Sequence, residues 1–184
     1  MSVDWEELNA KLPYQKNEEE KAQRSELWTS IDVNGNGYLS LAEVSRGIRD
    51  VINMDELFDA TPAINRSFFY CKGISGAGHH GPDYLERSEF RVFLQTLRLF
   101  FEFFHAFEMV DAENDRRISR EEFTAPEVRE TIEKWIGGVE DIEAEFDSID
   151  VNGGGQILFS EFVDWALSKD LDIEGDIDEA EADE

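Results

Sequence analysis

A twelve-residue pattern recurs along the chain, and it constrains the fold more than any other feature of the sequence. Three copies begin with Asp, end with Glu at the twelfth position and carry an aliphatic residue at the eighth. In chain order they are DVNGNGYLSLAE at 32–43, DAENDRRISREE at 111–122 and DVNGGGQILFSE at 150–161. A weaker copy, GHHGPDYLERSE at 78–89, keeps only the apolar eighth residue and the closing Glu. Because such a repeat reports one structural unit used several times, it has to be interpreted before a fold is assigned.

We number these loops first to fourth in chain order, and apolar residues at helical spacing flank them. Such residues precede the first loop at Leu27, Trp28 and Ile31, and the fourth at Ile142, Phe146 and Ile149. Others follow the loops, as at Phe90, Phe93 and Leu94 after the second. Each copy therefore predicts a helix, a loop and a helix.

Helix breakers set the limits of these predicted helices. The stretch 90–110 contains none, so the helix leaving the second loop is expected to continue as the helix entering the third. Its aromatic residues are predicted to form the core, namely Phe100, Phe101, Phe103, Phe104 and Phe107. Pro126 is expected to end or kink the helix after the third loop, and Gly137-Gly138 to separate the last two units.

The loop positions match the needs of a hard divalent cation. Calcium takes roughly six to eight oxygen ligands, and a twelve-residue loop supplies them from positions 1, 3, 5, 7, 9 and 12, using the backbone carbonyl at position 7. Position 6 turns sharply with a positive φ and therefore favours Gly. Position 8 points away from the ion and is expected to pair with position 8 of a neighbouring loop, so the loops should come in pairs.

The first loop meets all of these requirements. Gly37 occupies position 6, and the predicted ligands are Asp32, Asn34, Asn36, the Tyr38 carbonyl, Ser40 and Glu43. A turn-rich surface loop would need six matched positions to coincide, so we predict calcium binding here. Only Asp32 and Glu43 are anionic, which indicates a modest affinity.

The third loop carries more negative charge but departs from the pattern twice. Its predicted ligands are Asp111, Glu113, Asp115, the Arg117 carbonyl and Glu122, with Ser119 at position 9. Arg116 stands where Gly is expected and must adopt a left-handed conformation at a cost of about 1 kcal/mol. Glu113 is longer than the usual Asp or Asn. Calcium binding is the preferred interpretation, and an empty structural loop is the alternative.

The fourth loop offers fewer oxygens. Its predicted ligands are Asp150, Asn152, the Gln156 carbonyl and Glu161. Gly154 removes the side-chain ligand at position 5, and Leu158 cannot hold a water at position 9. Two interpretations stay open: a calcium site in which water replaces the missing oxygen, or a loop that only pairs with the third.

The second loop fails the oxygen count, because positions 1, 3 and 5 are Gly78, His80 and Pro82. A zinc site is not expected either, since two adjacent histidines and the distant Cys71 lack ligand spacing. We therefore predict a surface loop without a metal.

Net charge narrows the classes of partner. The chain has 17 Lys and Arg against 43 Asp and Glu, a net charge of −26 on 184 residues, which disfavours nucleic acid and anionic membranes. With 14 Phe and 4 Trp it nevertheless has apolar material for a core.

A single cysteine and an N-terminus without a secretory pattern predict a cytoplasmic protein. Nucleophile-elbow, phosphate-loop and zinc-hydrolase motifs are missing, so we predict that it is not an enzyme.

The repeats also set the predicted domains. We expect an N-terminal extension at 1–23, a loop pair at 24–100 whose second member is degenerate, a second pair at 101–168 and an acidic tail at 169–184. The tail holds nine acids and one Lys, a composition that predicts disorder.

These loops and their flanks resemble the EF-hand. The order VDWEEL, RSELWTSIDVNGNGYLSLAEV and EFTAPEVRETIEKWIGGVEDIEAEFDSIDVNGGGQILFSEFVDWALSK resembles the flagellar calcium-binding proteins of protists, the calflagins, over about residues 3–174. The resemblance implies an all-α fold of four EF-hand helix-loop-helix units in two paired, calmodulin-like lobes, with short two-stranded pairings between loops. It also implies calcium binding in the C-terminal loops, whereas the residues themselves rank the first loop highest.

The same resemblance implies a calcium sensor near the flagellar membrane, anchored by an acylated Gly-Cys segment. This chain begins Met1-Ser2-Val3, so no acylation motif is present at Ser2 and any membrane association is expected to be indirect. We expect a sensor that changes conformation with calcium and engages a protein target. Two alternatives stay open: a calcium buffer, and a structural or scaffolding protein with mostly vestigial loops.

Overall fold

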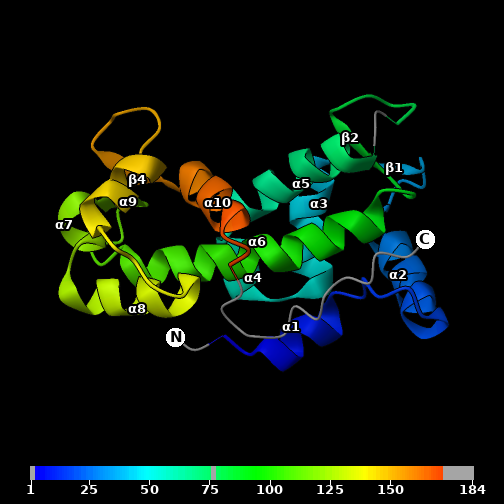
Figure 1. Ribbon diagram of the computed structural model, residues 1–184. Coiled ribbons are helices and arrows are strands. Elements are labelled where there is room, and N and C mark those ends of the chain that lie inside the picture. The colour runs from blue at the N-terminus through cyan, green and yellow to red at the C-terminus, as the bar shows by residue number, and fades with distance from the viewer. Residues whose placement is uncertain (1–2, 76–77, 172–184) are drawn as a thin grey trace, which may run out of the picture. The chain divides into compact units, whose positions relative to one another are not determined.

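The computed structural model describes residues 3–75 and 78–171, which are mostly helical (Figure 1). This confirms the predicted all-α class. Packing divides the chain into two units, Met1–Phe101 and Glu102–Glu184. Most of the predicted acidic tail, residues 172–184, lies outside the described residues.

The first unit contains two helix-loop-helix segments preceded by a short helix. Its elements are α1 (Trp5–Lys11), α2 (Glu18–Ile31), β1 (Tyr38–Ser40), α3 (Leu41–Gly47), the π-helical turn η1 (Ile48–Ile52), α4 (Asp55–Asp59), α5 (Thr61–Ser75), β2 (Tyr84–Glu86) and the start of α6 (Phe90–Val110). The Asn17 side chain accepts a hydrogen bond from the Glu20 amide and so caps the start of α2.

The N-terminal segment is part of the core of this unit. Leu8 and Leu12 are fully buried, and Trp5 packs edge-on against Phe101 with ring centroids 5.8 Å apart. The Arg98 guanidinium lies 5.0 Å from the Trp5 ring centroid. Residues predicted as an extension therefore contribute apolar area to the packed unit, which the polar composition of 1–23 concealed.

The second unit contains the end of α6 and two further helix-loop-helix segments. Its elements are β3 (Arg117–Ser119), α7 (Arg120–Phe123), α8 (Pro126–Ile136), α9 (Ile142–Ile149), β4 (Gln156–Leu158) and α10 (Phe159–Ser168). Helix α7 ends before Pro126, which opens α8 at its first turn, as its fixed φ favours. Gly137 ends α8 with a φ of 78°. Pro126 and Gly137 therefore break the helices as predicted. Beyond α10, Leu171 is still buried, so the packed part of this unit reaches at least that residue.

Short antiparallel strands join the loops in pairs. In the first unit Leu39 lies opposite Leu85, and in the second Ile118 lies opposite Ile157. All four side chains are fully buried. The predicted pairing through position 8 is therefore confirmed, and it holds two loops of each unit side by side.

Aromatic rings pack together in the core of each unit. Helix α6 runs without a break from Phe90 to Val110, and each of its five predicted core Phe residues is buried. In the first unit Trp28 meets Phe90 edge-on at 5.1 Å, and in the second Phe107 meets Phe162 at 5.5 Å. Burying one such side chain contributes about 1.5–3 kcal/mol, so these rings anchor the helices that flank the loops.

Candidate metal-binding loops

The first, third and fourth loops share one backbone conformation. A positive φ occurs at positions 4 and 6 of each: Gly35 (67°) and Gly37 (85°), Asn114 (54°) and Arg116 (67°), Gly153 (68°) and Gly155 (77°). The left-handed conformation expected of Arg116 is confirmed. The turn at position 4 was not predicted, although Gly or Asn stands there in every copy and could have indicated it.

The aspartate at position 1 organises each of these loops, because its carboxylate accepts hydrogen bonds from the backbone amides of positions 5 and 6. Asp32 accepts from Asn36 and Gly37 at 3.2 and 3.0 Å. Asp111 accepts from Asp115 and Arg116 at 3.2 and 2.8 Å. Asp150 accepts from Gly154 and Gly155 at 2.9 and 2.8 Å. The carboxylate thus lies inside the turn, where a cation-binding loop needs its first ligand.

The glutamate at position 12 links each loop to the helix that follows it. In the first loop one Glu43 oxygen accepts from the Ser40 amide and hydroxyl, both at 2.9 Å, and the other accepts from the Asn34 side-chain amide at 2.7 Å. Because Glu43 also forms a capping box with Ser40, it starts α3. The position-12 carboxylate therefore contacts positions 3 and 9 while fixing the exiting helix.

The third and fourth loops repeat this arrangement. Glu122 accepts from the Glu113 amide at 3.0 Å and from the Ser119 amide at 2.8 Å, and it caps α7 with Ser119. Glu161 accepts from the Asn152 amide at 3.1 Å and from the Leu158 amide at 2.9 Å. Leu158 has no hydroxyl, so the fourth loop lacks the additional bond from position 9.

Burial acts to raise the pKa of the Glu122 carboxyl, but hydrogen bonds from Ser119 and from the Glu113 and Ala112 amides outweigh it. The net result is a pKa below the ordinary value for Glu. Glu122 is therefore ionised at neutral pH, as a metal ligand must be.

The position-5 side chains of the first and third loops accept hydrogen bonds from the position-7 amides. The Asn36 side chain accepts from the Tyr38 amide at 3.0 Å, and Asp115 accepts from the Arg117 amide at 2.9 Å. The Arg117 guanidinium donates to the Gln156 side chain at 3.0 Å, so the two position-7 residues meet across the strand pair. A Cβ on Gly154 would lie 2.6 Å from the Asn152 side-chain oxygen, so a side chain at position 5 of the fourth loop would require Asn152 to move.

Within residues 3–75 and 78–171, no group of three or more His, Cys, Asp and Glu side chains converges. The first and fourth loops contain only two acidic ligands each, and amides, hydroxyls and carbonyls complete their predicted sets. In the third loop the four acids are not gathered into such a cluster. The donors of all three loops are nevertheless oxygens, which fits a hard cation such as calcium. The individual ligands stay predictions.

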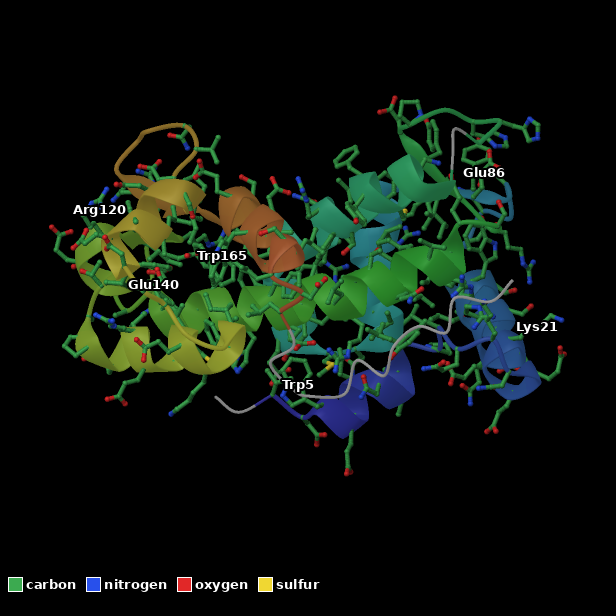
Figure 2. The ribbon with its side chains drawn as sticks, in the orientation of Figure 1. Trp5, Lys21, Glu86, Arg120, Glu140 and Trp165 are labelled. Carbon is green, nitrogen blue, oxygen red and sulfur yellow. The ribbon has the colours of Figure 1, made fainter. Side chains whose placement is uncertain are left out.

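The second loop is built differently. Gly81 at position 4 has a φ of 80°, but Asp83 at position 6 does not have a positive φ. Glu86, labelled in Figure 2, accepts from the His80 amide at 2.9 Å, and Lys72 contacts Glu89 at 2.6 Å. The loop pattern did not indicate Lys72, because Lys72 lies outside the loop and before it in the chain.

Several known proteins are similar to this chain. The family model for the FCaBP EF-hand domain matches residues 8–97. Flagellar calcium-binding protein TB-17 of Trypanosoma brucei brucei is 32% identical over 184 residues, spanning 97% of this chain and 77% of the relative. The flagellar calcium-binding protein of Trypanosoma cruzi is 32% identical over 180 residues, spanning 95% and 83%. A solved homolog of programmed cell death 6 protein from Leishmania major Friedlin aligns over 85% of this chain with a TM-score of 0.43 and 15% identity.

Paired helix-loop-helix units with oxygen-lined twelve-residue loops define an EF-hand protein. Within that class the chain belongs to the flagellar calcium-binding protein family. Family membership and the donor chemistry of the loops together make calcium its metal cofactor. The matched proteins are calcium-binding proteins, and no catalytic family is indicated. Among the described residues, no helix is both long and apolar enough to span a bilayer.

Proposed function

We propose that this protein is a calcium sensor in which the first, third and fourth loops bind the ion and the bound protein engages a protein target. The proposed ligands are Asp32, Asn34, Asn36, Tyr38, Ser40 and Glu43; Asp111, Glu113, Asp115, Arg117 and Glu122; Asp150, Asn152, Gln156 and Glu161. The observation that carries the proposal is the double role of the position-12 glutamate, which accepts hydrogen bonds from positions 3 and 9 of its loop and is a first-turn residue of the exiting helix.

This double role couples binding to helix position. Bound calcium supplies a double positive charge that competes for the loop oxygens. Glu43 would exchange its bonds with Asn34 and Ser40 for the ion, and α3 begins only two residues before Glu43. A displacement of this carboxylate is therefore transmitted to the helix.

A groove beside the fourth loop supports target binding by the second unit. It has a volume of 690 Å³, and its lining includes Val151, Leu158 and Trp165. Trp165 is labelled in Figure 2 on α10. Asn152 and Glu161, two proposed ligands, also line it. The shape of this apolar surface would thus respond to occupancy of the loop. The net charge of −26 favours a basic segment as the target.

The relatives are named as flagellar proteins, and we extend that location to this chain as part of the proposal. Attachment to the flagellum would then use a protein partner or an indirect membrane association. Localisation of a tagged protein expressed in its own cells tests this, and a diffuse cytoplasmic signal would contradict it.

Calorimetric titration with calcium tests the binding sites. We expect three sites with dissociation constants of roughly 10⁻⁷–10⁻⁵ M, the range of sensor loops. Glu43→Gln, Glu122→Gln and Glu161→Gln should each remove one site, because each loses a bidentate carboxylate. Glu121→Gln, at the exposed neighbouring position, is the control and should keep all three. Absence of heat at micromolar calcium would favour a structural protein instead.

A hydrophobic dye separates a sensor from a buffer. We expect its fluorescence to rise when calcium is added to the wild type and to rise less in Glu161→Gln. A signal that calcium does not change, together with intact stoichiometry, would identify a buffer.

A further inference from the structure

A lysine side chain enters the second loop from the helix that precedes it. The Lys72 ammonium on α5 donates to a Glu89 carboxylate oxygen at 2.6 Å and also to the Tyr84 backbone carbonyl. The Lys72 side chain is only 8% exposed and that of Glu89 only 3%. Tyr84 and Glu89 are positions 7 and 12 of the loop, whose carbonyl and carboxylate are the ligands at the same positions of the metal-binding loops. A cation therefore already lies between two ligand positions.

The rest of the second loop is rearranged around this cation. A Cβ on Gly78 would lie 2.6 Å from Glu86 Oε1, so the position-9 carboxylate occupies the space beside position 1. Glu86 accepts a hydrogen bond from the amide of His80, which is position 3 of this loop. In each of the other loops, the position-3 residue donates instead to the glutamate at position 12.

Glu89 consequently has a different set of partners from the other position-12 glutamates. Its Oε2 keeps the bond from the position-9 amide, at 2.8 Å from Glu86. Its buried Oε1 accepts no hydrogen bond from the described residues. The Lys72 ammonium is thus the group that balances the buried negative charge. Without an oppositely charged partner, a buried carboxylate would be strongly destabilising.

We propose that Lys72 is a covalently attached substitute for the metal ion of the second loop. Its ammonium holds the Tyr84 carbonyl and the Glu89 carboxylate together whether or not calcium is present. Because the cation is tethered, it does not dissociate when calcium falls, and β2 stays paired with β1. The first unit would then respond to calcium through its first loop alone, a consequence that rests on the proposed function.

Amide hydrogen exchange of the wild-type protein in EDTA tests the tether without any mutation. We expect the β1–β2 amides to exchange at least about tenfold more slowly than the β3–β4 amides, because one charge-assisted contact of this kind gives a factor of that order. Equal exchange in the two strand pairs, or faster exchange in β1–β2, would overturn the proposal.

Variants then assign the effect to Lys72. Lys72→Met should accelerate exchange of the β1–β2 amides by at least about tenfold in EDTA, because it also leaves the Glu89 charge uncompensated. The double variant Lys72→Met/Glu89→Gln, which leaves no unbalanced charge, should still show an acceleration of about tenfold and replaces the single variant if that one fails to fold. Lys21→Met, at an exposed lysine, is the control. Wild-type protection in the double variant would show that Lys72 only neutralises Glu89, and the proposal would fail.

Calcium titration keeps this test separate from the proposed function. Lys72→Met should weaken calcium binding at the first loop, because its paired strand is no longer held. An unchanged first-loop affinity would overturn the claim that Lys72 supports this loop. If the wild-type first loop took up no calcium, the proposed function would fail there, while the exchange contrast in EDTA would still decide the role of Lys72.

Discussion

The two units differ in one loop of each pair. In the second unit both loops carry an aspartate at position 1 and a glutamate at position 12, and we propose that both bind a free ion. In the first unit only the first loop does so, and the second holds the Lys72 ammonium between its Tyr84 carbonyl and Glu89. The backbone pairing is the same in both, with buried position-8 residues facing each other. If both proposals hold, the calcium dependence of a loop is decided by the source of its positive charge and not by its backbone pairing.

The largest expected effect is the loss of the tethered cation. Lys72→Met should destabilise the first unit by about 3–5 kcal/mol, because removing one partner of a buried ion pair leaves the other uncompensated. Urea unfolding in EDTA, followed by exchange of peptides from each unit, measures this. Lys21→Met should change stability by less than about 1 kcal/mol, as expected for an exposed charge. A loss confined to the second unit would contradict the comparison.

Calcium should stabilise the two units unequally. At a free concentration of 100 times the dissociation constant, each occupied site adds about 2.7 kcal/mol. The second unit, with two loops, should gain about twice as much as the first. Hydrogen exchange of each unit with and without calcium gives the two values. Equal gains would mean that the fourth loop stays empty or that the second loop binds calcium after all.

Left-handed turns at position 6 allow a smaller comparison between the first and third loops. Arg116 adopts a φ of 67°, so Arg116→Gly should relieve about 1 kcal/mol of backbone strain, partly offset by the entropy of Gly. Gly37 adopts a φ of 85° with no atom within 4 Å of an added Cβ, so Gly37→Ala should cost about 1 kcal/mol through conformation alone. Thermal melting in EDTA would show both. Changes of the same sign would refute this account.

The smallest expected effect is the slow reaction of Cys71 with a thiol reagent. Burial, with the nearby Glu89 charge, raises the pKa of the Cys71 thiol to about 12, so the thiol stays protonated and unreactive near pH 8. Cys71 is buried next to Lys72, so its labelling reports opening of the second loop region. Even in EDTA, the rate of reaction with a thiol reagent near pH 8 should be far below that of a free cysteine. A rate in EDTA equal to that of a free cysteine would show that calcium, and not Lys72, keeps this region closed.

Short-range patterns made the loops predictable. The uninterrupted α6 and the start of α8 at Pro126 followed from helix breakers, because neighbours in sequence set these features. The pairing of Leu39 with Leu85 followed from their shared position in the repeat. The left-handed turn at Arg116 followed for the same reason. The helices between 48 and 75 were not specified, since their apolar residues are not tied to a loop motif.

By itself, the sequence determined the number of loops and the residue of each loop that pairs, since the twelve-residue repeat marks both. Only the tertiary structure decided that Leu8 and Leu12 belong to the core and that Lys72 fills the second loop. Lys72 and Glu89 are 17 positions apart and meet only because α5 and the loop pack together. A ligand set is local chemistry, whereas a tethered cation depends on where a helix from outside the motif places its side chain.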